Sequence, residues 1–180
     1  MQVMRKMWLL LMCGPWIVGC GPQVRPSEYH DWVHDPSHGM LKSSVGLEQD
    51  WECVYLPTDY MIVNELRSDE IVSSAYASLK TWYASSVYFK LLIPRDESRP
   101  LNALDLESDL MEHLVLEDGH QEIPLSACHV ESDGFMGPEY RVMLTFPIDF
   151  ESLNHFQLKY VDLFHFEYDR SEMLIPNLKY

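Results

Sequence analysis

Hydrophobic and polar residues alternate along much of this chain, which is the pattern of strands with one buried face. The alternation is clearest over 87–93, where Val87, Phe89, Leu91 and Ile93 share one side. The same pattern predicts strands over 50–56, 140–146 and 156–161. Further strands are expected over 40–46, over the apolar runs 110–117 and 120–125, with a continuation of the second over 127–131, and as a closing edge strand over 172–180. The chain is therefore expected to contain seven or eight short strands.

A helical period interrupts the alternation over 58–66 and again over 68–82. Ser68 is suited to cap the second helix, because Asp69 and Glu70 then fall in its first turn, where carboxylates are favoured. Apolar residues follow at intervals of three to four. We therefore expect a mainly β, antiparallel, sandwich-like domain with a helical insert over about residues 58–82.

A tight turn is predicted at Asp118-Gly119, between two apolar runs. This dipeptide favours a type I′ hairpin turn, because both central positions of that turn need positive φ. The segments on either side are expected to pair as a hairpin.

The first twenty residues differ from the rest. Arg5 and Lys6 precede a short apolar run that ends in Ile17-Val18-Gly19-Cys20. A basic start, an apolar stretch and small residues at the end are the parts of an export signal. The run is too short for a spanning helix, which needs roughly twenty apolar residues.

The Ile17-Val18-Gly19-Cys20 sequence resembles the lipobox of bacterial lipoproteins. The resemblance implies that Cys20 receives a diacylglyceryl group, that a peptidase removes residues 1–19, and that the new amine is acylated, for example with palmitate. Several acyl chains would hold the protein firmly in a membrane. Residues 20–27 would be a lipidated tether and 28–180 a single globular domain. Gly21, which is not Asp, resembles the sorting pattern of outer-membrane lipoproteins, so we expect the protein to be lipid-anchored in the cell envelope, at the outer membrane.

The charge balance is strongly acidic. The whole chain carries −15, and removal of Arg5 and Lys6 with the signal leaves −17. This charge argues against nucleic acid as a partner and against electrostatic attachment to anionic lipid. Because 47% of the residues are hydrophobic, the chain can still bury a full core.

Two cysteines, Cys53 and Cys128, remain after Cys13 leaves with the signal and Cys20 is lipidated. In an oxidising envelope they could form a disulfide. The alternative is two separate buried thiols.

The best candidate for metal chemistry is the segment with His30, His34 and His38, because imidazole is a common ligand of first-row metals. Pro36 prevents one continuous helix from aligning the three rings. The alternative, which we favour, is a solvated polar segment, and we assign no metal or other cofactor. Cys128 and His129 are adjacent on a predicted strand, so they face opposite sides and cannot act as nucleophile and base.

No nucleophile elbow or phosphate-binding loop occurs in the sequence, so we assign no catalytic residue and expect a non-enzymatic domain. It would bind an envelope protein or play a structural part. The alternatives are a metal-binding module or enzyme using the histidine segment, and a carbohydrate-binding sandwich that displays Trp32, Trp51, Trp82, Tyr83 and Tyr88. The stretches 32–36, 116–119 and 175–180 resemble uncharacterised envelope lipoproteins of Bacteroidetes-type bacteria, which implies no particular activity.

Overall fold

The structure is a computed structural model that describes residues 22–47, 51–67, 73–96, 102–119, 121–131, 138–161 and 163–178. Its strands are β1 (Gln23–Val24), β2 (Leu41–Ser43), β3 (Glu52–Leu56), β4 (Val87–Pro94), β5 (Leu114–Asp118), β6 (Gln121–Pro124), β7 (Ala127–Val130), β8 (Glu139–Phe146), β9 (His155–Tyr160), β10 (Phe164–Asp169) and β11 (Asn177–Leu178). Its helices are α1 (Tyr29–Val33), α2 (Thr58–Leu66), α3 (Ser73–Tyr83) and α4 (Ala103–His113), with 3₁₀ turns η1 (Pro26–Glu28), η2 (Pro36–His38), η4 (Phe150–Ser152) and η5 (Arg170–Glu172). None of the helices in these ranges is long and apolar enough to cross a membrane.

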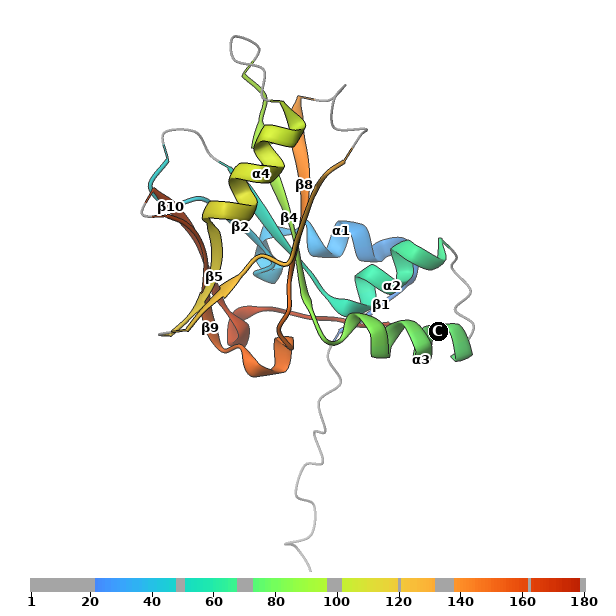
Figure 1. Cartoon of the computed structure of the whole chain (residues 1–180). Coiled ribbons are helices and arrows are strands. Elements are labelled where there is room, and N and C mark those ends of the chain that lie inside the picture. Colours follow the sequence, from blue (N-terminus) through green and yellow to red (C-terminus); the bar gives the residue numbers. More distant parts are fainter. Residues whose placement is uncertain are drawn as a thin grey trace, which may run out of the picture.

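Two antiparallel sheets form the body of the domain (Figure 1). One has the strand order β2-β3-β4-β8-β7 and the other the order β10-β9-β5-β6. The bridge between Val45 and His165 links the two sheets where β2 and β10 lie close together. The prediction of a mainly β, antiparallel, sandwich-like domain with a helical insert is confirmed.

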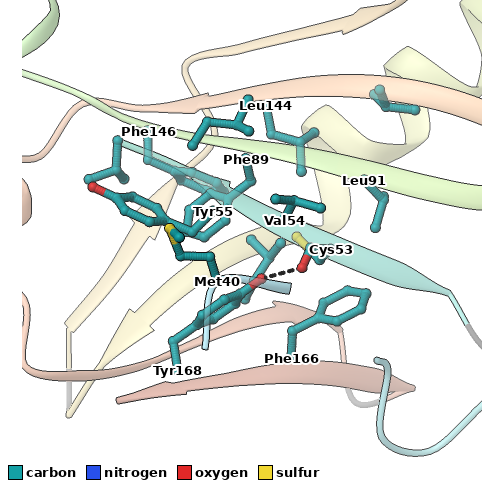
Figure 2. Close-up of a cluster of buried hydrophobic side chains, with 14 of the residues drawn as sticks. Met40, Cys53, Val54, Tyr55, Phe89, Leu91, Leu144, Phe146, Phe166 and Tyr168 are labelled. Carbon is teal, nitrogen blue, oxygen red and sulfur yellow. Dashed lines mark hydrogen bonds between the residues drawn. The ribbon is translucent and has the colours of Figure 1, made fainter. Parts of the chain in front are cut away.

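The core lies between the two sheets and is rich in aromatic rings (Figure 2). Phe89 of β4 is fully buried, and its ring centroid lies 6.3 Å from that of Phe156 on β9 and 5.4 Å from that of Tyr168 on β10. Tyr168 satisfies its buried hydroxyl by donating to the Cys53 carbonyl oxygen at 2.8 Å. This pattern follows from alternation: every second residue of β4 and β8 is buried.

Three helices pack together beside this sandwich, on the right of Figure 1. Val54 on β3 points away from the inter-sheet core and is still fully buried, because α1 packs on that strand. The Tyr29 ring of α1 lies 6.0 Å from the Tyr60 ring of α2. Helix α3 then packs on α2, which confirms that the helical pattern after β3 forms an insert; residues 68–72 lie outside the described ranges.

The expectation of a strand over 110–117 is wrong in its first part. Residues 103–113 form α4, and the strand begins only at Leu114. Asn102 caps the helix by accepting a hydrogen bond from the Leu104 N–H at 3.0 Å, and Leu106 and Leu110 are its buried residues. Leu110 and Met111 near the end of this helix are apolar, like Leu114, Val115 and Leu116 of β5, so the sequence pattern extends the apolar run of the strand back to residue 110.

The β5–β6 hairpin and two other strands also differ from expectation. Asp118 pairs with Gln121 and is therefore the last residue of β5 rather than part of the loop, and Gly119 has the positive φ, 63°. Strand β7 does not continue β6, because β6 belongs to the four-stranded sheet and β7 to the five-stranded sheet. Strand β10 was not predicted at all.

The first and last strands of the described chain pair with each other. Residues 22–27, expected to belong to a tether, form β1 and the start of η1, and the Val24 side chain is only 3% exposed. The closing strand expected over 172–180 is reduced to β11, which pairs in parallel with β1 in a separate two-stranded sheet. The folded unit therefore includes residues from Pro22 onward, and Cys20 lies outside the described residues.

Candidate functional site

A groove of about 280 Å³ lies between α1 and α2. Its apolar and aromatic walls are formed by Pro26, Tyr29, Tyr60 and Val63. Its polar lining consists of His30, Asn64 and Arg67. We call this the α1–α2 groove, and its lining combines apolar and aromatic side chains with groups that can hydrogen-bond to a ligand.

Arg67 has an unusual backbone for its residue type. It follows the last turn of α2 with φ 47° and ψ 33°, in the left-handed region that favours glycine. Its N–H donates to the Val63 carbonyl oxygen at 3.0 Å, which ends the helix, and its side chain is exposed.

Arg67 is also unusual among the cations. Each of the other lysines and arginines in the described ranges has an ionic or ring partner: Arg25, Lys42, Lys80, Lys90, Arg95, Arg141, Lys159 and Arg170. Within those ranges Arg67 has none. Among the described residues nothing pairs with the Arg67 guanidinium, which lines the groove of a domain with strongly negative charge.

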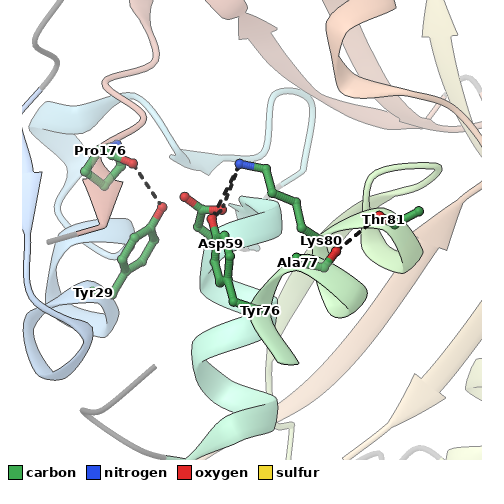
Figure 3. A network of polar contacts seen from close by, with 7 residues as sticks. All are labelled: Tyr29, Asp59, Tyr76, Ala77, Lys80, Thr81 and Pro176. Atoms are coloured by element: carbon green, nitrogen blue, oxygen red, sulfur yellow. Dashed lines mark hydrogen bonds and ion pairs between the residues drawn. The ribbon is translucent and has the colours of Figure 1, made fainter. Parts of the chain in front are cut away.

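The tyrosines of the groove are neutral hydrogen-bonding groups. Burial, and secondarily the negative charge of Asp59, raises the pKa of the Tyr29 hydroxyl far above its ordinary value. That hydroxyl donates to the Pro176 carbonyl oxygen at 3.4 Å (Figure 3). Asp59 itself accepts a hydrogen bond from the Tyr76 hydroxyl at 2.6 Å and lies 3.9 Å from the Lys80 ammonium, so its charge is directed to α3.

The three candidate histidines do not converge on one point. The His30 and His34 rings stack at 4.2 Å, and His34 Nδ1 lies 2.7 Å from the His30 carbonyl oxygen. His38 instead stacks on Trp32 at 3.7 Å, with its Nδ1 2.9 Å from the Trp32 carbonyl oxygen. The described residues contain no cluster of three or more side chains arranged to hold a metal ion.

A disulfide between Cys53 and Cys128 is excluded by the sheet order. Cys53 lies on β3 and Cys128 on β7, with β4 and β8 between them. Three strand spacings of about 4.8 Å separate them by roughly 14 Å, whereas a disulfide needs Cα atoms within about 7 Å. Burial raises the pKa of each thiol to about 12, so both are protonated.

Cys128 and His129 do point to opposite faces of β7. Cys128 is partly buried, whereas His129 is exposed and lies 3.4 Å from the Glu107 carboxylate. The same Glu107 accepts a hydrogen bond from the Val130 N–H at 2.7 Å, which closes the free edge of β7 with α4.

The aromatic residues proposed for sugar stacking separate into different places. Trp82, Tyr83 and Tyr88 lie together, with ring centroids 5.0 and 5.5 Å apart and edge-to-face geometry. Tyr83 is buried, so Trp82 is the ring of this group with a large exposed surface. Trp32 packs on His38 and Trp51 on Phe164, away from that cluster.

A second surface feature surrounds the turn between β9 and β10. Val161, Leu163 and Val45 expose 45%, 63% and 51% of their surface, and they line one shallow hollow of about 270 Å³. We call these three residues the hairpin patch. Val161 has φ 46°, which is a genuine outlier for a β-branched residue.

Backbone contacts hold the hairpin patch in position. Val161 donates its N–H to the His113 carbonyl oxygen at 3.1 Å. Gly46 has φ 106°, and an added Cβ there would lie 2.8 Å from the Leu163 carbonyl oxygen. The segment carrying Val45 can therefore approach the hairpin this closely only with glycine at position 46.

From the sequence, His30 was a candidate only as a metal ligand, and neither Arg67 nor the hairpin patch was predicted. The isolated apolar pair Val161 and Leu163, flanking Asp162 between two strands, was the available signal for the patch. No sequence signal marks Arg67, because its lack of a partner within the described ranges depends on how the chain folds.

No family model and no curated protein sequence matches this chain. Among solved structures it is similar to a protein of unknown function from Burkholderia pseudomallei, with 11% sequence identity and a TM-score of 0.36. That similarity covers 77% of this chain and 83% of the other.

Proposed function

We propose that this protein is a non-enzymatic lipoprotein of the cell envelope, anchored through Cys20, whose β-rich domain binds another envelope protein at the hairpin patch. The observation that supports the binding role is Val161: an exposed β-branched residue held in a left-handed backbone conformation, next to exposed Leu163.

Strain of this kind costs about 1–3 kcal/mol, and the surrounding structure must maintain it. Glycine or asparagine at position 161 would relieve the backbone strain and would also remove apolar surface from water. The hairpin patch instead exposes apolar side chains beside the hollow, as expected for a surface that another protein covers.

The position of the patch favours a protein partner over the lipid surface. Strands β9 and β10 lie on the left of Figure 1, apart from β1, where the described chain begins (Figure 1). A lipid on Cys20 would enter near β1, and the net charge of −17 opposes contact with anionic lipid.

The test compares two exposed leucines. Leu163 belongs to the patch, and Leu104 on α4 is 72% exposed and lies outside it. A photo-crosslinking amino acid is placed at each position of the full chain in its own envelope. We expect a discrete protein adduct from position 163 that is absent from position 104.

The matched substitutions complete the test. Leu163→Ser should reduce recovery of the crosslinked protein in affinity capture, and Leu104→Ser should leave it unchanged. The absence of an adduct from position 163, or equal recovery with both variants, would refute the proposal.

A further inference from the structure

The α1–α2 groove carries a second inference that is independent of the hairpin patch. From its geometry and charge, we propose that it is a binding site for a small monocarboxylate with an apolar body, whose carboxylate pairs with Arg67. Pro26, Tyr60 and Val63 would contact the apolar part of the ligand.

The charge of Arg67 favours an anionic ligand. In a chain with 28 acidic and 13 basic residues, an arginine without a partner in the described ranges is unexpected. A guanidinium presents its donors in a planar fork that matches a carboxylate. Arg67 therefore offers an anion two parallel hydrogen bonds without first breaking an ion pair that the structure shows.

The backbone of Arg67 is strained, which also supports a binding role for this residue. Glycine or asparagine would serve better in a left-handed residue after a helix, and they are the usual choices there. In this conformation Arg67 lines the groove. Backbone strain at a ligand-contacting residue is a recurrent feature of binding sites.

The lining and size of the groove suit a small ligand with an apolar body. Asn64 and His30 add hydrogen-bonding groups near Arg67, while the remaining lining is apolar or aromatic. The volume of about 280 Å³ lies just below the roughly 300–1,000 Å³ of pockets for drug-sized molecules, so the ligand is small. Because Arg67 is the one lysine or arginine among the lining residues, and the domain is acidic, the groove favours a monoanion over a phosphate of higher charge.

The experiment titrates sodium hexanoate into the mature chain carrying Cys20→Ser, which removes the acyl chains that could compete for the groove. Hexan-1-ol serves as the uncharged probe of similar length. Binding is followed by NMR through the Arg67 Nε–H and Asn64 side-chain resonances, and the same spectra show whether each variant is folded.

We expect saturable shifts of both resonances with hexanoate and binding of hexanol that is weaker by roughly tenfold. Arg67→Ala should weaken hexanoate binding by roughly tenfold or more, because a charge-assisted hydrogen bond is lost. Arg141→Ala is the control: Arg141 is exposed on β8, ion-paired with Glu139, and should bind hexanoate like the unaltered chain. The proposal is refuted if hexanoate gives no saturable shift, if hexanol binds equally well, or if Arg67→Ala has no effect.

Discussion

The conformation of Arg67 makes a quantitative prediction for Arg67→Gly. A left-handed conformation costs an L-residue about 1–2 kcal/mol, and glycine adopts it freely. Glycine in turn loses about 0.5–1 kcal/mol more chain entropy on folding. Because the Arg67 side chain is exposed and has no partner in the described ranges, its removal costs little. The balance is a gain in unfolding free energy of about 0.5–1 kcal/mol, or a rise in Tm of about 2 °C.

Urea denaturation of the mature chain with Cys20→Ser measures this gain. Arg67→Ala is the matched variant, because it removes the guanidinium and keeps a Cβ in the left-handed region. Its stability should equal that of the chain with Arg67. Both variants should bind hexanoate more weakly than the chain with Arg67. Only Arg67→Gly should combine this weaker binding with a higher unfolding free energy. The reasoning is refuted if Arg67→Gly is less stable than the chain with Arg67, or if Arg67→Ala is stabilised as much as Arg67→Gly.

Three further predictions follow from other parts of the fold. Burial lowers the pKa of His34 in the folded state, so folding favours the neutral imidazole. The contribution of His34 to the unfolding free energy is therefore fully present above the unfolded-state pKa of about 6.5, and it is lost as the pH falls through the lower folded-state pKa. His34→Gln should therefore flatten the decrease of the urea midpoint between about pH 7 and pH 5, and an unchanged slope would contradict the assignment. Alkylation after denaturation without reductant should label both Cys53 and Cys128, and a disulfide-linked peptide would contradict the sheet order. Glu107→Ala should lower the unfolding free energy by about 1–2 kcal/mol, because the Val130 N–H loses its acceptor, and Glu107→Gln should cost less in the same urea assay.

The sequence was most informative where a strand has one face in the core. Strands β4 and β8 alternate strictly, and the structure places them side by side with Phe89 opposite Leu144. The helical insert was predictable because its period changes immediately after Pro57.

Helix α4 shows why alternation can mislead. Ala103, Leu106 and Leu110 have helical spacing, and Asn102 is a suitable cap, so the information was present. The helical spacing was hard to recognise because Leu104 is apolar although it is 72% exposed, and because the apolar run of β5 follows the helix directly. A period-based boundary therefore fails where a strand follows a helix without a loop.

The candidate sites were less predictable than the fold, for a physical reason. The lack of a partner for Arg67 among the described residues depends on which carboxylates the fold brings close to it, and no local pattern encodes this. The positive φ of Val161 is imposed by tertiary contacts such as the one with the His113 carbonyl oxygen, against the intrinsic preference of valine.

The proposal that this is an envelope lipoprotein is tested most directly by the intact mass of the protein purified from its own envelope. The account predicts a chain that begins at Cys20 and carries the added mass of several acyl chains, and a Cys20→Ser variant without that mass that leaves the membrane fraction. An unmodified Cys20 in a membrane-bound protein, or a Cys20→Ser variant that remains in the membrane, would contradict it.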